Sequence, residues 1–264
     1  MNTTALGAIL MLIPLIPTWS TLSAQGTVPV TTDERPAWVV EGVPDSVWIL
    51  VEASSEADEE DRRKDLLKQA ETQARAAIEG HPDDVGRRFA LAVVLGIRTD
   101  IEGGRTKIKT ASMLQQELEA ILELDPQHAR ARHLQGRLHA GVRRMNGITR
   151  WVATSFLGGG ELKKATWERA EENLSFAEQQ APEVSDHHLQ LATLYADTDR
   201  TELALQELEH VFQLSAASAM ERAVWDQALD VKDEWEQKLA RGPERPGCRR
   251  FATHRPGRRR AACE

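Results

Sequence analysis

Three segments of the chain share one pattern of apolar and polar positions, and a proline interrupts each of them. Small or apolar residues stand twelve, eight and five positions before both Pro82 and Pro182. They are Ala70, Ala74 and Ala77 in the first segment and Ala170, Leu174 and Ala177 in the second. At Pro126 the helical pattern stops and resumes, with Gly136 among the later positions. A proline disfavours a helical conformation in the residue before it and suits the first turn of a new helix. The pattern therefore predicts helical hairpins.

The spacing of the small residues extends this prediction to a repeat. In the last unit Ala192 and Ala204 lie twelve residues apart, as in the tetratricopeptide repeat, a helical hairpin of about 34 residues. Small side chains at such positions let two helices cross closely. We therefore predict an all-α fold, a tetratricopeptide-repeat α-solenoid of about four helical hairpins over residues 45–240.

The composition agrees with helical packing. Apolar residues make up 41% of the chain, but only five residues are Phe and one is Tyr, which favours Leu and Ala packing over a β-sandwich or barrel. Val47–Val51 is the one β-rich run. Asp45 and Ser46 stand before it and predict a helix N-cap.

The spacing between the prolines is irregular. They are 44 and 56 residues apart, so the chain holds insertions of about 10 and 22 residues relative to a period of about 34. The first insertion contains residues 100–109. The second contains residues 145–160, where Ile148, Trp151 and Phe156 lie on one side of a helix that a run of glycines ends. We predict an inserted amphipathic helix that covers a groove, a membrane or a partner, or that simply packs on the array.

The N-terminal segment predicts export. Residues 1–24 contain no charged side chain, and residues 5–17 form an almost unbroken apolar run that is too short to span a bilayer. The small residues at 22–24 provide a cleavage site, so we predict a secretory signal peptide over 1–24 and a periplasmic or extracellular protein. An uncleaved membrane anchor through residues 5–17 is the alternative, because basic residues are missing before the run. Residues 25–44 are expected to form a flexible spacer.

The C-terminal segment, residues 241–264, differs in charge from the rest of the chain. It holds eight Arg and two Glu, which give it a net charge of +6. Because the whole chain has a net charge of −8, the remaining residues have a net charge of −14. Without apolar periodicity this tail is expected to be disordered. Two interpretations fit this composition. The tail is either a basic arm that binds nucleic acid or anionic lipid, or a solvated terminus without a binding function. Aromatic residues do not alternate with the arginines, which makes nucleic acid the less favoured partner. Both cysteines, Cys248 and Cys263, lie here.

The sequence contains no recognisable catalytic or metal motif. The glycines and lysines of 158–164 lack the Ser or Thr of a phosphate-binding loop, and the segment follows a helix instead of a strand. His187 and His188 are adjacent, so on a helix they point about 100° apart and differ from the i, i+4 pair of zinc-binding helices. We predict a protein that is not an enzyme and has no cofactor and no metal.

The resemblance to tetratricopeptide repeats implies that the first helix of each pair lines a concave face, and it suggests candidate binding residues there. Arg130, His133 and Arg137 form one stripe, and Phe89 and Val93 occupy the equivalent phase of the preceding unit. Together with Trp151 and Phe156 of the inserted helix, they predict a mixed groove for an amphipathic helix or an acyl chain with an acidic head. An internal ion-pair face formed by the basic stripe with Glu117, Glu119 and Glu123 is the alternative.

Several motifs together resemble a known family. They are Gly136-Arg137, Trp151 with Phe156-Leu-Gly158, Ala165-Thr-Trp167-Glu168 and Leu191-Ala-x-Leu-Tyr195. They are similar to the helical domain of the regulator of microtubule dynamics family and of its bacterial relatives, over roughly Pro44 to Leu214. The resemblance implies a right-handed all-α array that binds protein or lipid. Roles at microtubules or mitochondrial contacts are not expected in an exported, bacterial-looking chain. We expect a protein-binding scaffold in the cell envelope, or alternatively an amphiphile carrier with the inserted helix as its lid.

Overall fold

The computed structural model describes residues 43–157, 159–216 and 219–241. These residues form ten α-helices and one short 3-10 helix, with no strand among them, which confirms the predicted all-α class. The signal-peptide prediction lies outside the described residues, as do Cys248, Cys263 and nearly all of the spacer and the basic tail. None of the described helices is both long and apolar enough to cross a membrane.

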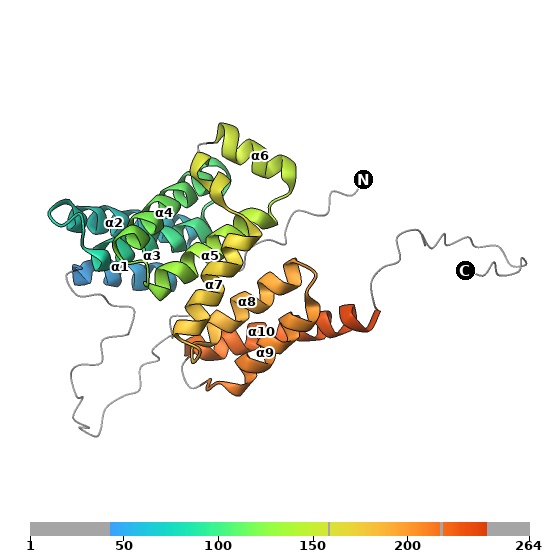
Figure 1. Ribbon diagram of the computed structural model, residues 1–264. Helices are drawn as coiled ribbons and strands as arrows, with labels where there is room; N and C mark the ends of the chain where they lie inside the picture. The colour runs from blue at the N-terminus through green and yellow to red at the C-terminus, as the bar shows by residue number, and fades with distance from the viewer. Residues whose placement is uncertain (1–42, 158, 217–218, 242–264) are drawn as a thin grey trace, which may run out of the picture.

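Most of the helices follow one another as packed neighbours along the chain (Figure 1). The first pairs are α1 (Asp45–Glu56) with α2 (Glu60–Glu79) and α3 (Val85–Ile101) with α4 (Gly104–Leu124). They are followed by α5 (Ala129–Arg144) with α7 (Trp167–Gln180), then α8 (Ser185–Asp197) with α9 (Thr201–Gln213), and α10 (Ala219–Arg241). Between α5 and α7 the chain forms α6 (Gly147–Phe156) and the 3-10 helix η1 (Gly160–Lys164). Apart from this link the connections are short, which favours an antiparallel arrangement of successive packed helices.

The three prolines lie between helices, as predicted. Pro82, Pro126 and Pro182 stand in the links before α3, α5 and α8. The helix N-cap predicted for Asp45 and Ser46 is wrong, because α1 starts at Asp45 after Pro44 and no side chain caps it. The Ser46 hydroxyl instead donates a hydrogen bond to Gln73 on α2.

Small residues occupy the helix crossings that the pattern required. Ala92, Gly136 and Ala192 each stand ten residues after a proline, and all three are buried. A Cβ atom added to Gly136 would lie 2.6 Å from Leu174 Cγ and 3.0 Å from the Ala170 carbonyl oxygen on α7. The close contact between α5 and α7 therefore depends on the absence of a side chain at position 136.

Gly136→Ala should therefore lower the free energy of unfolding by about 1–3 kcal/mol, because Leu174 is buried and cannot move aside. Gly141 provides a matched control in the same helix, since a Cβ there meets nothing within 4 Å. Gly141→Ala should stabilise the protein by up to about 1 kcal/mol through helix propensity. Urea denaturation of both variants measures the difference. Equal effects would mean that α5 and α7 do not approach closely at Gly136.

The two insertions have different structures. The first does not form a separate element, because α3 continues to Ile101 and α4 begins at Gly104, so both helices are long. The second forms α6 and η1, while α5 and α7 still pack directly on each other. α6 projects from the side of the molecule where α4 and α5 lie (Figure 1). The helix predicted in the second insertion is thus present as α6.

A buried charged network holds the turn between α3 and α4. Arg98 Nε donates to Glu102 Oε1 at 3.0 Å, and another guanidinium nitrogen contacts Glu71 on α2. Thr110 of α4 donates to Glu102 Oε2 at 2.6 Å. Arg98 and Glu102 are 7% and 6% exposed. Their hydrogen bonds satisfy charges that would otherwise be costly to bury, and they connect three helices.

Candidate functional site

The predicted basic stripe on α5 is engaged with residues of neighbouring helices. The Arg130 guanidinium lies 5.2 Å from the centre of the Phe89 ring on α3. His133 Nε2 donates to Asp186 Oδ2 of α8 at 3.0 Å, and Arg137 Nη1 lies 3.6 Å from the same oxygen. The structure therefore brings His133 and Arg137 together around one carboxylate. Only 13% of the Arg137 side chain is exposed.

Two carboxyl groups flank Arg137 and differ in acidity. Burial opposes ionisation of Asp186, but the hydrogen bond from His133 and the charge of Arg137 outweigh it and hold the pKa of this carboxyl well below its usual range. Burial raises the pKa of Asp100, near the end of α3, to about 6, although Arg137 and Lys107 oppose this shift. Arg137 therefore lies between one fully ionised and one weakly acidic carboxyl group.

The predicted apolar residues on α3 belong to the core. Phe89 is 4% exposed and packs against the His128 ring, with 4.9 Å between ring centres. Val93 is partly buried against the same core. Two of the acidic residues expected to pair with the stripe have other partners, since Glu117 pairs with Arg88 of α3 and Glu119 with Lys164 of η1. Within the described residues, His133 and Arg137 of the stripe contact Asp186 of α8 instead.

The other two predicted residues lie on α6, apart from the α5 stripe. Trp151 and Phe156 are 60% and 63% exposed, and their rings meet edge to face with centres 5.1 Å apart. Ile148 is 79% exposed. Contacts on the opposite side hold the helix, where Ala153 is buried and its carbonyl oxygen accepts a hydrogen bond from the Gly159 N–H at 3.1 Å. The aromatic pair thus faces solvent, and the contacts of Ala153 attach the helix to the rest of the protein.

A depression of about 500 Å³ lies among α4, α5, η1 and α7. Its lining consists mainly of charged and polar side chains: Glu119, Glu123, Arg132, Gln135, Lys164 and Arg169, with Leu122 as the apolar member. Sites that bury small apolar ligands have mostly apolar walls. This hollow therefore suits a polar surface contact better than an acyl chain.

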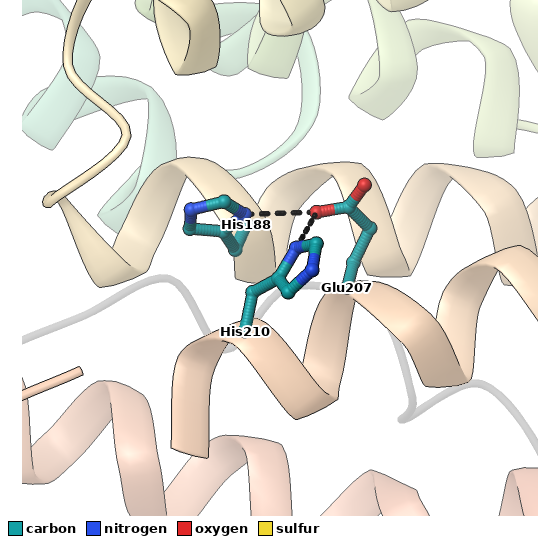
Figure 2. Close-up of side chains that lie close together, drawn as sticks. All are labelled: His188, Glu207 and His210. Carbon is teal, nitrogen blue, oxygen red and sulfur yellow. Dashed lines mark hydrogen bonds and ion pairs between the residues drawn. The ribbon is translucent and has the colours of Figure 1, made fainter. Parts of the chain in front are cut away.

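One cluster was missed by the sequence reasoning. His188 of α8 lies beside Glu207 and His210 of α9, and Figure 2 shows the three side chains converging from the two helices. The Nδ1 atom of His188 is 2.8 Å from Glu207 Oε2, and that of His210 is 3.5 Å from the same oxygen. The adjacent His187 instead packs against His133, with ring centres 4.7 Å apart and ring planes tilted by 40°. In the sequence, the only signal of this cluster was the i, i+3 spacing of Glu207 and His210. His188 lies on the other helix, so no spacing along the chain connects it to them.

Comparison with known proteins identifies the family of the chain. No individual curated protein matches it. A family model described as regulator of microtubule dynamics protein 1-3 matches residues 45–236, from the start of α1 into α10. This match covers most of the chain and agrees with the motifs in α5, α6 and α7 that suggested it. The chain therefore belongs to the regulator of microtubule dynamics protein 1-3 family.

Proposed function

We propose that the protein is a non-enzymatic helical scaffold that binds a protein partner, with α6 as the main binding surface. The observation that carries this proposal is the exposure of Ile148, Trp151 and Phe156 on one short helix. Clusters of exposed apolar side chains are uncommon on monomeric proteins and mark interaction sites. Trp residues are also enriched among those that dominate binding energy.

We also infer that the helix pairs form a tetratricopeptide array. Four pairs, α1/α2, α3/α4, α5/α7 and α8/α9, succeed one another, and each second helix also packs on the first helix of the next pair. The buried small residues at 92, 136 and 192 support the same repeat, because they stand at one phase after each proline. The comparison of Gly136→Ala with Gly141→Ala tests the close crossing that this inference requires.

The exposed surface fits an amphipathic helix of a protein partner. Such a helix presents apolar side chains at i, i+3 and i+4, which would pack against the edge-to-face pair of Trp151 and Phe156. A carrier with α6 as lid requires an apolar cavity under this helix. The depression next to η1 is lined by charged side chains, and Trp151 and Phe156 face solvent, so the scaffold is the better-supported proposal.

Replacing Trp151 and Phe156 by Ala together tests the proposal. We expect the double variant to bind its partner at least about tenfold more weakly, because aromatic anchors carry much of the binding energy. Its free energy of unfolding should change little, since both side chains are exposed in the free protein. The partner is first captured from the envelope fraction of cells that express the chain, and its affinity is then measured with purified proteins.

Ile49→Ala provides the matched control, because Ile49 is 62% exposed on α1 and should leave affinity unchanged. The proposed location in the cell envelope rests on residues 1–24, so the captured chain should begin near Gln25. An intact Met1 would instead favour the anchored form. Equal affinity of the wild type and the double variant would show that α6 is not the binding surface.

A further inference from the structure

The His188 side chain is held in one tautomer by a backbone carbonyl. Its Nε2 atom is 2.8 Å from the carbonyl oxygen of Pro182. A carbonyl oxygen can only accept, so Nε2 carries the hydrogen and donates it. In the neutral ring the other nitrogen, Nδ1, then presents a lone pair. The proline link before α8 thus orients a nitrogen donor toward α9.

The lone pair of His188 faces another electron donor. Nδ1 lies 2.8 Å from Glu207 Oε2, and both atoms are acceptors when the imidazole is neutral. Two acceptors at this distance repel each other unless a cation lies between them. That cation is either a proton on the imidazole or a metal ion bound by both atoms. His188 is 4% exposed, so water screens this repulsion poorly.

A second histidine completes a set of three donors. His210 stands one helical turn after Glu207, and its Nδ1 atom is 3.5 Å from the same carboxylate oxygen. One donor atom from each of the three residues lies within 4.8 Å of the others. In a tetrahedral zinc site with bonds of about 2.0–2.1 Å, the donor atoms are about 3.3 Å apart. Small side-chain rotations would therefore bring the three donors to bonding distance.

We propose that His188, Glu207 and His210 form a binding site for a divalent transition-metal ion, represented by zinc. The hydrogen bond from His188 to Pro182 supplies the outer contact that orients metal-binding histidines in proteins. His210 is about half exposed, with 52% of its side chain accessible, so an ion can enter from solvent and a water can complete the coordination. Two nitrogen donors favour zinc, nickel or copper over magnesium and calcium. The ion would connect α8 to α9, the helices that carry the three side chains drawn in Figure 2.

Thermal unfolding of the full chain, without a polyhistidine tag, tests this proposal. Zinc chloride at a concentration about 100-fold above the dissociation constant should raise Tm by roughly 5 °C or more. Titration calorimetry should show one zinc ion bound at this site, and magnesium chloride should leave Tm unchanged. His210→Ala removes an exposed ligand at little cost to folding, and it should abolish most of the zinc-dependent shift.

Two further variants keep the result interpretable. Glu207→Gln retains the shape of the side chain but loses the charge, and should also abolish most of the shift. His81→Ala removes an exposed histidine elsewhere and should respond to zinc like the wild type. Cys248 and Cys263 remain in every variant, so zinc bound by the tail would shift all of them equally. An equal shift in the wild type, His210→Ala and Glu207→Gln would overturn the proposal, as would no shift in the wild type.

Discussion

Arg98→Met should lower the free energy of unfolding by about 3–5 kcal/mol, the usual cost of leaving a buried charge without its partner. Arg98 and Glu102 are both buried. Removal of the guanidinium leaves the Glu102 carboxylate with only the Thr110 hydroxyl as a donor. Methionine fills a similar volume, so most of the loss would come from the unpaired charge. Urea denaturation near neutral pH measures the change.

The control for this variant is Arg105→Met, because Arg105 is exposed at the start of α4. Its free energy of unfolding should stay within about 0.5 kcal/mol of the wild type. Combining Arg98→Met with Glu102→Leu should recover part of the loss, since the isolated carboxylate is then gone. If Arg98→Met and Arg105→Met unfold at the same urea concentration, the network between α2, α3 and α4 does not contribute as described.

The protein should lose stability as pH falls from 6.5 toward 4, partly through two buried histidines. Burial, together with the charge of Arg169, lowers the pKa of His139 to about 4, and burial with the neighbouring His133 lowers that of His187 to about 4. Unfolded histidine has a pKa of about 6.5. The unfolded chain therefore binds more protons in this range, and acid favours unfolding. Each histidine contributes a loss of about 2 kcal/mol at pH 5.

His139→Gln isolates one of these contributions. His139 Nε2 donates to Gln115 Oε1 at 3.0 Å, and the amide N–H of glutamine can replace that donor without titrating. The variant should lose about 2 kcal/mol less than the wild type between pH 7.5 and pH 5, as measured by urea denaturation at each pH. Asp100 acts in the opposite direction, because its raised pKa gives the folded protein the extra proton, but it is common to both proteins. Parallel pH profiles would show that His139 is not a buried neutral group.

The sequence was sufficient to predict those features of the structure that depend on residues close together in the chain. Pro82, Pro126 and Pro182 act on their own backbone, so the helix boundaries beside them could be predicted. Gly136 could be recognised from the spacing of small residues. In contrast, the surplus residues near position 100 lengthen α3 and α4, and Arg98 and Glu102 at their junction contact groups on α2 and α4. Glu71 is 27 residues from Arg98 in the sequence, and spacing alone could not identify this pair.

The candidate sites show the same limit. The amphipathic pattern of α6 predicted its apolar side, but the pattern alone could not say whether this side is covered or exposed. Asp186 is 53 residues from His133 in sequence, and no periodicity connects the two. The cluster of His188, Glu207 and His210 depends on how α8 crosses α9. Residue types at a fixed spacing identify sites within one helix, whereas these sites are formed by two.

The attachment of α6 has a consequence for the rate at which a partner would leave. The helix has ten residues and a single buried side chain, Ala153, and its main packing is against η1. Its local unfolding exposes little apolar surface and can occur without unfolding of α5 or α7. A partner that needs the ordered helix cannot bind while the helix is locally unfolded, so the apparent affinity falls with the ordered fraction. Such a surface favours brief, exchangeable complexes over permanent ones.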